Sequence, residues 1–150
     1  VAATAREALL DEAARKLDPN HKDIAYGEGI SYAMLGKRND ALAWLALSVK
    51  QAPRAESWYR LGLLYLDANA ASKAAIAYAQ ATKMAHDDEA AGKQAPTWLT
   101  EAYWQLGQLE DNEGHEAKAC DAYDAYLARN PADVNKVNSV NRAKLRLRCR

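Results

Sequence analysis

Small and large apolar residues recur along this chain in three stretches with the same spacing. In each stretch a glycine is followed by an alanine 12 positions later and by a large apolar residue 16 positions later. The three sets are Gly29/Ala41/Leu45, Gly62/Ala74/Tyr78 and Gly107/Ala119/Tyr123. No segment alternates cleanly with a period of two, which argues against β-strands. A period of roughly 34 residues in alanine-rich sequence is typical of repeated helical hairpins.

Each repeat unit is expected to hold two helices, named helix A and helix B, and a single helix should lie at either end of the array. The sequence therefore predicts eight helices. Asp133 is placed to cap a last helix from Val134 to about Leu147, with Val134, Val137 and Val140 on its inner face. The expected boundaries are a half-repeat over about 3–19, units over about 22–54, 55–88 and 100–132, an insertion over 89–99, and a capping helix over about 133–148.

The second unit resembles the tetratricopeptide repeat (TPR) family, with seven of the eight pattern positions matched and His86 in place of the usual proline. The matching residues are Trp58, Leu61, Gly62, Tyr65, Ala74, Tyr78 and Ala81. The first unit departs from the family pattern at Ala25, Glu28 and Ser48, and the third departs at Glu110 and Tyr126. The resemblance implies an all-α fold, a right-handed α-α solenoid of TPR-like hairpins.

The balance of charge changes this picture only at the C-terminus. Lys plus Arg and Asp plus Glu number 20 each, so the formal net charge is zero, which argues against a general nucleic-acid binder. Residues 133–150 nevertheless carry a net charge of +5. This basic end favours either an acidic partner or a solvated last helix that complements its own dipole. No apolar run reaches the roughly 18 residues that a membrane span needs. The chain begins at Val1, and we interpret it as a piece of a longer protein.

Candidate chemistry is scarce. His21, His86 and His115 fall at repeat edges without a nearby nucleophile, so we expect neither an enzyme nor a bound cofactor or metal. The acidic run over 87–89 has two interpretations, a metal or docking site and a solvated helix end, of which we favour the second. Cys120 and Cys149 lie near facing ends of antiparallel helices. We expect two free thiols there, with a disulfide that fixes the terminal helix as the alternative.

In the TPR family, helix A positions between the packing residues line a concave groove, and the resemblance implies the same groove here. The position after the first large residue is aromatic in every unit, and the position three residues earlier is acidic. Aromatic side chains on such a wall are common hot spots for peptides, although they can instead pack against a neighbouring helix A. The candidate residues are Asp23, Tyr26, Ile30, Glu56, Tyr59, Arg60, Leu63, Glu101, Trp104 and Gln108.

These features predict a protein–protein interaction scaffold or adaptor that binds a peptide or an amphipathic helix. The lysines and asparagines with which some family members clamp a C-terminal carboxylate are missing from these positions, which disfavours that ligand. The alternative function is self-assembly through the open ends of the solenoid, which would give a homo-oligomer, and a weaker one is a regulatory module bound to an enzyme. Composition favours a bacterial source, and a cytoplasmic location is slightly favoured over a periplasmic one.

Overall fold

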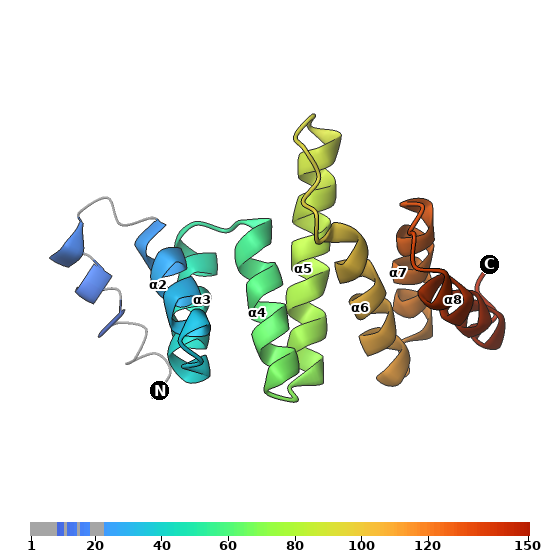
Figure 1. Cartoon of the computed structure of the whole chain (residues 1–150), viewed down its shortest axis with the longest axis horizontal. Coiled ribbons are helices and arrows are strands. Elements are labelled where there is room, and N and C mark those ends of the chain that lie inside the picture. Colours follow the sequence, from blue (N-terminus) through green and yellow to red (C-terminus); the bar gives the residue numbers. More distant parts are fainter. Residues whose placement is uncertain (1–8, 11, 15, 19–22) are drawn as a thin grey trace.

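The computed structural model describes residues 9–10, 12–14, 16–18 and 23–150, and every regular element within them is helical. The helices stand side by side in a row from the N-terminal to the C-terminal end (Figure 1). Together they form an α-α solenoid of TPR-like hairpins, as the repeat pattern predicts. The numbered helices are α2 (Ile24–Met34), α3 (Arg38–Gln51), α4 (Ala55–Asp67), α5 (Ala71–Ala90), α6 (Leu99–Asn112), α7 (Glu116–Ala128) and α8 (Val134–Leu147).

The predicted half-repeat over 3–19 lies partly outside the described residues. Among those that are described, residues 9–10, 12–14 and 16–17 are helical, and Ala14 is fully buried against Ala25, Trp44 and Leu47. This segment therefore covers the first hairpin, α2 and α3, from the N-terminal side.

The repeat glycines let helix A and helix B of one hairpin approach closely. A Cβ atom added to Gly107 would lie 2.4 Å from a ring carbon of Tyr123, and one added to Gly62 would lie 3.1 Å from the ring of Tyr78. A Cβ atom added to Gly29 would lie 2.6 Å from Cγ of Leu45. The nearest side chain is thus the large residue 16 positions on. The large side chain reaches the glycine because it spans the gap between the two helices.

Each hairpin turns through the same backbone motif. The residue seven positions after each repeat glycine has a positive φ, at Gly36 (74°), Asn69 (55°) and Gly114 (78°). Its N–H and that of the next residue bond back to carbonyls of the last helical turn, as in a Schellman motif. Glycine and asparagine tolerate this left-handed conformation, which explains why these residue types end each helix A.

Departures from the family pattern are matched by local partners. Ser48 and Ser57 are both buried, and their hydroxyl groups hydrogen-bond to each other at 3.1 Å between α3 and α4. Glu110 is only 6% exposed and pairs with the ring of His115 at 2.6 Å. Tyr126 is buried in the cluster where α8 packs on the third hairpin. Each of these polar or large residues therefore has a partner in the folded chain.

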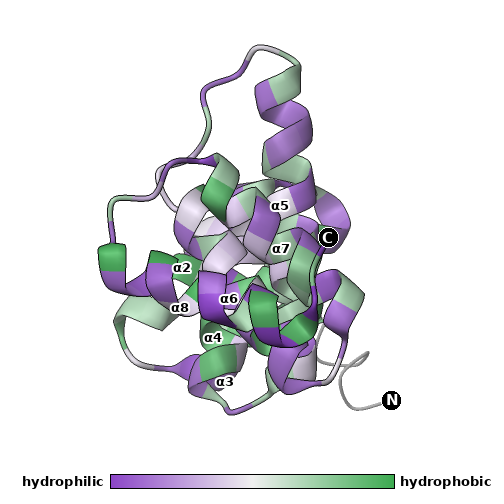
Figure 2. Cartoon of the chain, turned by 90° about the vertical axis from the view of Figure 1, so that its right-hand side faces the viewer, coloured by the Kyte–Doolittle hydropathy of each residue, from purple (hydrophilic) through white to green (hydrophobic). Residues whose placement is uncertain are grey.

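α5 is 20 residues long, compared with 14 in α3 and 13 in α7, and it includes Glu89 and Ala90, the first two residues of the segment predicted to be an insertion. The last turns of α5 project beyond the row of helices and are mostly hydrophilic (Figures 1 and 2). Arg129, just after α7, binds this projecting end of α5: its two terminal nitrogens donate hydrogen bonds to the two carboxylate oxygens of Glu89 at 3.1 and 3.3 Å. The chain then returns along residues 91–98 to begin α6.

The C-terminal helix α8 covers the third unit. Asp133 caps it by accepting a hydrogen bond from the backbone N–H of Lys136 at 3.0 Å, as predicted. Val140 is fully buried and Val137 partly so, but Val134 is 68% exposed, so its assignment to the inner face was wrong. Val134 is the first residue of α8, and at this point the helix does not yet pack on the third unit.

Cys120 and Cys149 form a disulfide, with their Cα atoms 5.5 Å apart, so the expectation of two free thiols was wrong. A straight continuation of α8 would carry Cys149 past Cys120. Instead, Arg148 adopts a left-handed conformation (φ 56°), and the N–H of Cys149 bonds back to the carbonyl of Lys144 at 2.9 Å. This reversal at the end of the helix brings the two sulfur atoms together.

Candidate functional site

The candidate site is the helix A face, defined here as the ten residues of α2, α4 and α6 and their N-caps that the sequence singles out. Each of these helices presents one acidic and one aromatic side chain three residues apart, called here an acid–aromatic pair. The pairs are Asp23/Tyr26, Glu56/Tyr59 and Glu101/Trp104. All three aromatic side chains are half-buried, so they are neither part of the sealed core nor free in solvent.

In the first unit both members of the pair contact Arg54. Its guanidinium forms an ion pair with Asp23, and its Cζ atom lies 4.9 Å from the ring centroid of Tyr26. Tyr26 and Ile30 pack on the core cluster that contains Leu45. Burial raises the pKa of Tyr26, so the ring stays neutral and its face can accept the cation.

In the second unit the pair contacts Trp98. The Trp98 indole stacks on Tyr59 with ring centroids 4.3 Å apart and planes 6° from parallel. Its Nε1–H donates a hydrogen bond to Glu56 at 2.5 Å. The other oxygen of Glu56 pairs with Nε of Arg60 at 3.0 Å. Leu63, one turn along α4 from Tyr59, is half-buried and belongs to none of the core clusters of the described residues.

In the third unit the pair contacts Lys136 of α8. The Lys136 Nζ atom lies 2.6 Å from a Glu101 oxygen and 4.2 Å from the ring centroid of Trp104. Gln108 faces inward and donates to the hydroxyl of Tyr123 at 2.9 Å. That hydroxyl donates in turn to Asp111 at 3.2 Å. Burial, with the Asp111 charge beside it, raises the pKa of Tyr123 to about 12.

The same arrangement recurs in all three units: each acid–aromatic pair receives a cation or an N–H donor from the start of the helix that follows the hairpin. The three donors, Arg54, Trp98 and Lys136, were missed by reasoning from the sequence. A signal existed, because Arg54 and Trp98 are the N-cap residues of α4 and α6, the helix A of the next unit. Lys136 occupies the first turn of α8, the helix that takes the place of the next helix A.

The acidic run at the end of α5 is bound by cations of the chain itself. Asp87 pairs with Lys83 at 3.1 Å and Asp88 with Lys93 at 3.5 Å, in addition to the Glu89 contact described above. Within the described residues, no cluster of three or more His, Cys, Asp or Glu side chains is arranged to hold a metal ion. No helix among those described is both long and apolar enough to cross a membrane. Exposed ion pairs of this kind are consistent with a solvated helix end.

No protein-family model matches the chain, and no curated protein matches it. The fold is similar to a crystal structure of MamA, with a TM-score of 0.65 and 25% sequence identity. The similarity covers 89% of this chain and 72% of the MamA chain. A second crystal structure of MamA protein matches with a TM-score of 0.65 and 26% identity over 87% of this chain and 66% of the other. The chain thus shares a TPR-like solenoid with MamA, and this is the architecture of a protein-interaction scaffold.

Proposed function

We propose that this chain is a scaffold or adaptor module that binds a peptide or an amphipathic helix of another protein along the helix A face. The stacked hairpins present an extended surface, which is the form in which solenoids bind their partners. The surface carries aromatic side chains with an acidic margin, a combination that suits a ligand with both apolar and basic residues.

The observation that carries the proposal is the way α8 lies on the third unit. α8 is amphipathic: it buries Val140 and Ala143 and places Lys136 against both Glu101 and Trp104. The chain thereby supplies an internal example of the ligand that we propose. A partner helix with a lysine or an arginine in the same register would make the same two contacts with an acid–aromatic pair.

The second unit offers the clearest place for an external ligand. Leu63 and the stacked rings of Tyr59 and Trp98 form an apolar strip, and Arg60 is exposed beside them. The acidic margin keeps accessible charge, since the side chains of Asp23 and Glu101 are 81% and 43% exposed. Long-range attraction of a basic ligand to these carboxylates should weaken as salt is added. In this proposal three of the ten residues support the face without direct contact to the ligand. They are Tyr26 and Ile30, which pack on the core, and Gln108, which hydrogen-bonds to Tyr123.

The test measures binding of a basic amphipathic peptide selected against the protein from a peptide library. We expect Tyr59→Ala/Trp104→Ala and Leu63→Asp each to weaken binding by about tenfold or more, which is the range of hot-spot changes. Ile76→Asp is the matched control, since Ile76 is an apolar residue 61% exposed on α5, outside the helix A face. Circular dichroism must show that every variant keeps its helical content. Undiminished binding by the two helix A variants, or an equal loss in the α5 control, would refute the proposal.

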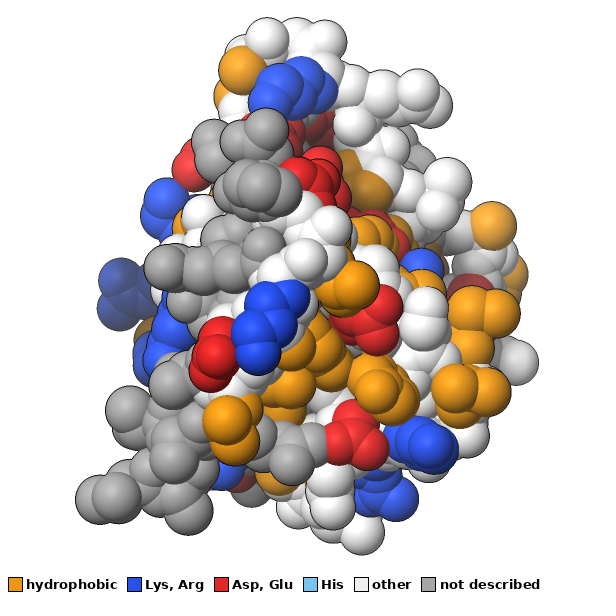
Figure 3. Space-filling view, turned by 90° about the vertical axis from the view of Figure 1, so that its left-hand side faces the viewer, with side chains coloured by type: hydrophobic (Ala, Val, Ile, Leu, Met, Phe, Trp, Pro, Cys, Tyr) orange, Lys and Arg blue, Asp and Glu red, His pale blue; other side chains and the backbone are white. Residues whose placement is uncertain are grey.

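Self-assembly is the second candidate, and exposed apolar side chains at the two ends of the solenoid favour it. At the N-terminal end Leu9 and Leu17 are 66% and 69% exposed, and hydrophobic groups gather on that face among charged ones (Figure 3). At the other end α8 exposes Leu145 (80%) within its basic surface. Sedimentation velocity over a wide concentration range separates the two candidates, because head-to-tail stacking gives a size that grows with concentration and ligand binding alone does not.

A further inference from the structure

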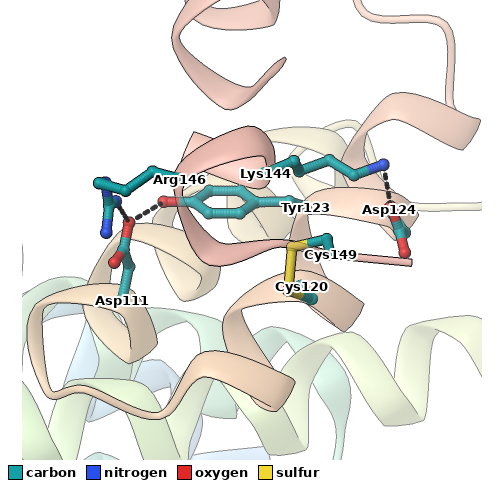
Figure 4. Close-up of a disulfide and its surroundings, with 7 residues drawn as sticks. All are labelled: Asp111, Cys120, Tyr123, Asp124, Lys144, Arg146 and Cys149. Carbon is teal, nitrogen blue, oxygen red and sulfur yellow. Dashed lines mark hydrogen bonds and ion pairs between the residues drawn. A yellow bond between two sulfur atoms is a disulfide. The ribbon is translucent and has the colours of Figure 1, made fainter. Parts of the chain in front are cut away.

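The helix α8 is held on the third unit by a short apolar face and by ion pairs on either side of it. Val140 and Ala143 of this helix are buried, and Val137 and Leu147 pack beside them while partly exposed, so its apolar anchor consists of four side chains. Its cations bind carboxylates at both sides: Arg146 pairs with Asp111 at 2.5 Å, and Lys144 pairs with Asp124. Figure 4 shows these two side chains pointing to opposite sides of the helix end, with the disulfide between them. Ion pairs with exposed members contribute little each, so they do not by themselves hold a helix in place.

The disulfide closes the far end of this attachment. It joins Cys149, just beyond α8, to Cys120 in α7 across 29 residues of sequence. A cross-link of this kind removes conformations in which α8 is detached, and therefore favours the docked helix. With the disulfide open, docking would depend on this apolar anchor and the ion pairs alone.

One polar group of the third unit, beside the Lys136 contact, is unsatisfied. Trp104, whose ring carries Lys136, has a buried indole Nε1 without a hydrogen-bond partner. A buried N–H without an acceptor is unfavourable, and it gains a partner if another segment supplies an oxygen. A partner segment that supplies an acceptor to this N–H would make a contact that α8 does not make.

The disulfide lies where a reductant can approach it. Cys149 helps to line an open surface hollow of about 390 Å³ together with Asn141, Lys144, Leu145 and Arg148. The positive charges of Lys144 and Arg148 favour an approaching thiolate and also a cysteine thiolate formed there.

We propose that α8 is an internal ligand locked by the Cys120–Cys149 disulfide, and that opening the disulfide with a dithiol reductant exposes the Glu101/Trp104 pair to a basic amphipathic helix of a partner protein. This inference rests on the proposed function for the identity of the partner, but the release of α8 itself does not. The oxidised chain keeps the third unit covered, and the reduced chain presents all of the helix A face.

The reaction is a two-electron thiol–disulfide exchange. A thiolate of the reductant attacks Sγ of Cys149 through the hollow, a mixed disulfide forms, and the Cys120 sulfur leaves as a thiolate that takes up a proton. The second thiol of the reductant then attacks the reductant sulfur that is bonded to Cys149, and Cys149 is released as a thiolate that takes up a proton. The products are two cysteine thiols and the oxidised, disulfide form of the reductant, so electrons and protons balance.

The first experiment follows the release of α8 without any partner. Amide hydrogen exchange is measured by mass spectrometry on the full chain, oxidised and after reduction by dithiothreitol. We expect exchange in α8 to become about tenfold or more faster on reduction, while α2 to α5 stay unchanged, because local opening affects only the detached segment. The Cys120→Ser/Cys149→Ser variant should exchange rapidly in α8 with or without reductant, which controls for effects of the reductant itself. Unchanged exchange in α8, or acceleration throughout the chain, would overturn the proposal.

The second experiment tests what the exposed pair binds. The probe is a labelled synthetic peptide of residues 133–150 that carries Cys149→Ser, and its binding is followed by fluorescence anisotropy. We expect the reduced chain to bind the peptide at least about tenfold more tightly than the oxidised chain. Without the disulfide, α8 is joined to the protein only at its N-terminal end, so it leaves the site often enough for the peptide to compete. A peptide with Lys136→Ala should lose this gain. Equal binding of the peptide by the oxidised and the reduced chain would refute the proposal that the disulfide locks α8. If hydrogen exchange shows that α8 is released but the reduced chain binds no basic amphipathic helix of another protein, only the proposed function is refuted.

Discussion

Replacement of Gly107 by alanine should destabilise the protein, although alanine is the better helix former. The added Cβ atom would lie 2.4 and 2.5 Å from two ring carbons of Tyr123. Carbon atoms attract best at about 3.5–4.0 Å, so the ring or the helix would have to move by about 1 Å. The Tyr123 ring has little freedom to do so, because it is fully buried and its hydroxyl is bonded to both Gln108 and Asp111.

The expected magnitude follows from two opposing effects. Overpacking of a well-packed site costs about 1–3 kcal/mol of folding free energy. Replacing a helical glycine by alanine returns about 0.5–1 kcal/mol. We therefore expect Gly107→Ala to lower the free energy of unfolding by about 1–2 kcal/mol, and the melting temperature by about 2–8 °C for a chain of this size.

Two glycines provide matched comparisons. A Cβ atom at Gly27 in α2 would have no heavy atom within 4 Å, so Gly27→Ala should stabilise the protein by about 0.5–1 kcal/mol. Gly62→Ala should fall between the two, since its Cβ would lie 3.1 Å from Tyr78, close enough for a small adjustment to suffice. Urea denaturation followed by circular dichroism measures all three variants. If Gly107→Ala proves as stable as the parent, or less damaging than Gly62→Ala, the close crossing of α6 and α7 is not what the glycine provides.

Three further predictions concern buried side chains. Tyr78→Phe should leave the free energy of unfolding unchanged or raise it by up to about 1 kcal/mol, because the buried Tyr78 hydroxyl has no partner. Tyr123→Phe should lower it by about 1 kcal/mol, because the Tyr123 hydroxyl is hydrogen-bonded. The reverse order of stability in urea denaturation would contradict this. Burial raises the pKa of Tyr123 to about 12, above the ordinary value of 10.0, so stability is complete below pH 10 and falls between pH 10 and 12, where only the unfolded chain has lost the proton. Absorbance of tyrosinate against pH should show this delayed ionisation, and Tyr123→Phe should reduce its amplitude by the contribution of one tyrosine, because the pKa of other buried tyrosines such as Tyr78 is raised too. In the same denaturation assay Val140→Ala should lower the free energy of unfolding by about 1–2 kcal/mol, because Val140 is fully buried. Val134→Ala should lower it by less than about 0.5 kcal/mol, because Val134 is 68% exposed. Equal effects would show that α8 does not pack through Val140.

The sequence by itself determined the features that depend on neighbours close along the chain. The repeat of glycine, alanine and a large apolar residue specifies a hairpin because all three fall within one unit, and the structure has a hairpin at each repeat. The bounds of α8 were predicted correctly because its cap, Asp133, bonds to an N–H only three residues away. The choice of Gly36, Asn69 and Gly114 at the hairpin turns follows from the same local geometry.

Only the tertiary structure decided which residues from different units meet. The acid–aromatic pairs could be read from periodicity, but their partners lie 31 residues away for Asp23, 42 for Glu56 and 35 for Glu101. The angle between successive hairpins sets those contacts, and no local pattern encodes it. The disulfide depended likewise on a single left-handed residue, Arg148, that reverses the chain after α8. Helix periodicity places a side chain on a face, whereas the packing of whole helices selects the group that this face contacts.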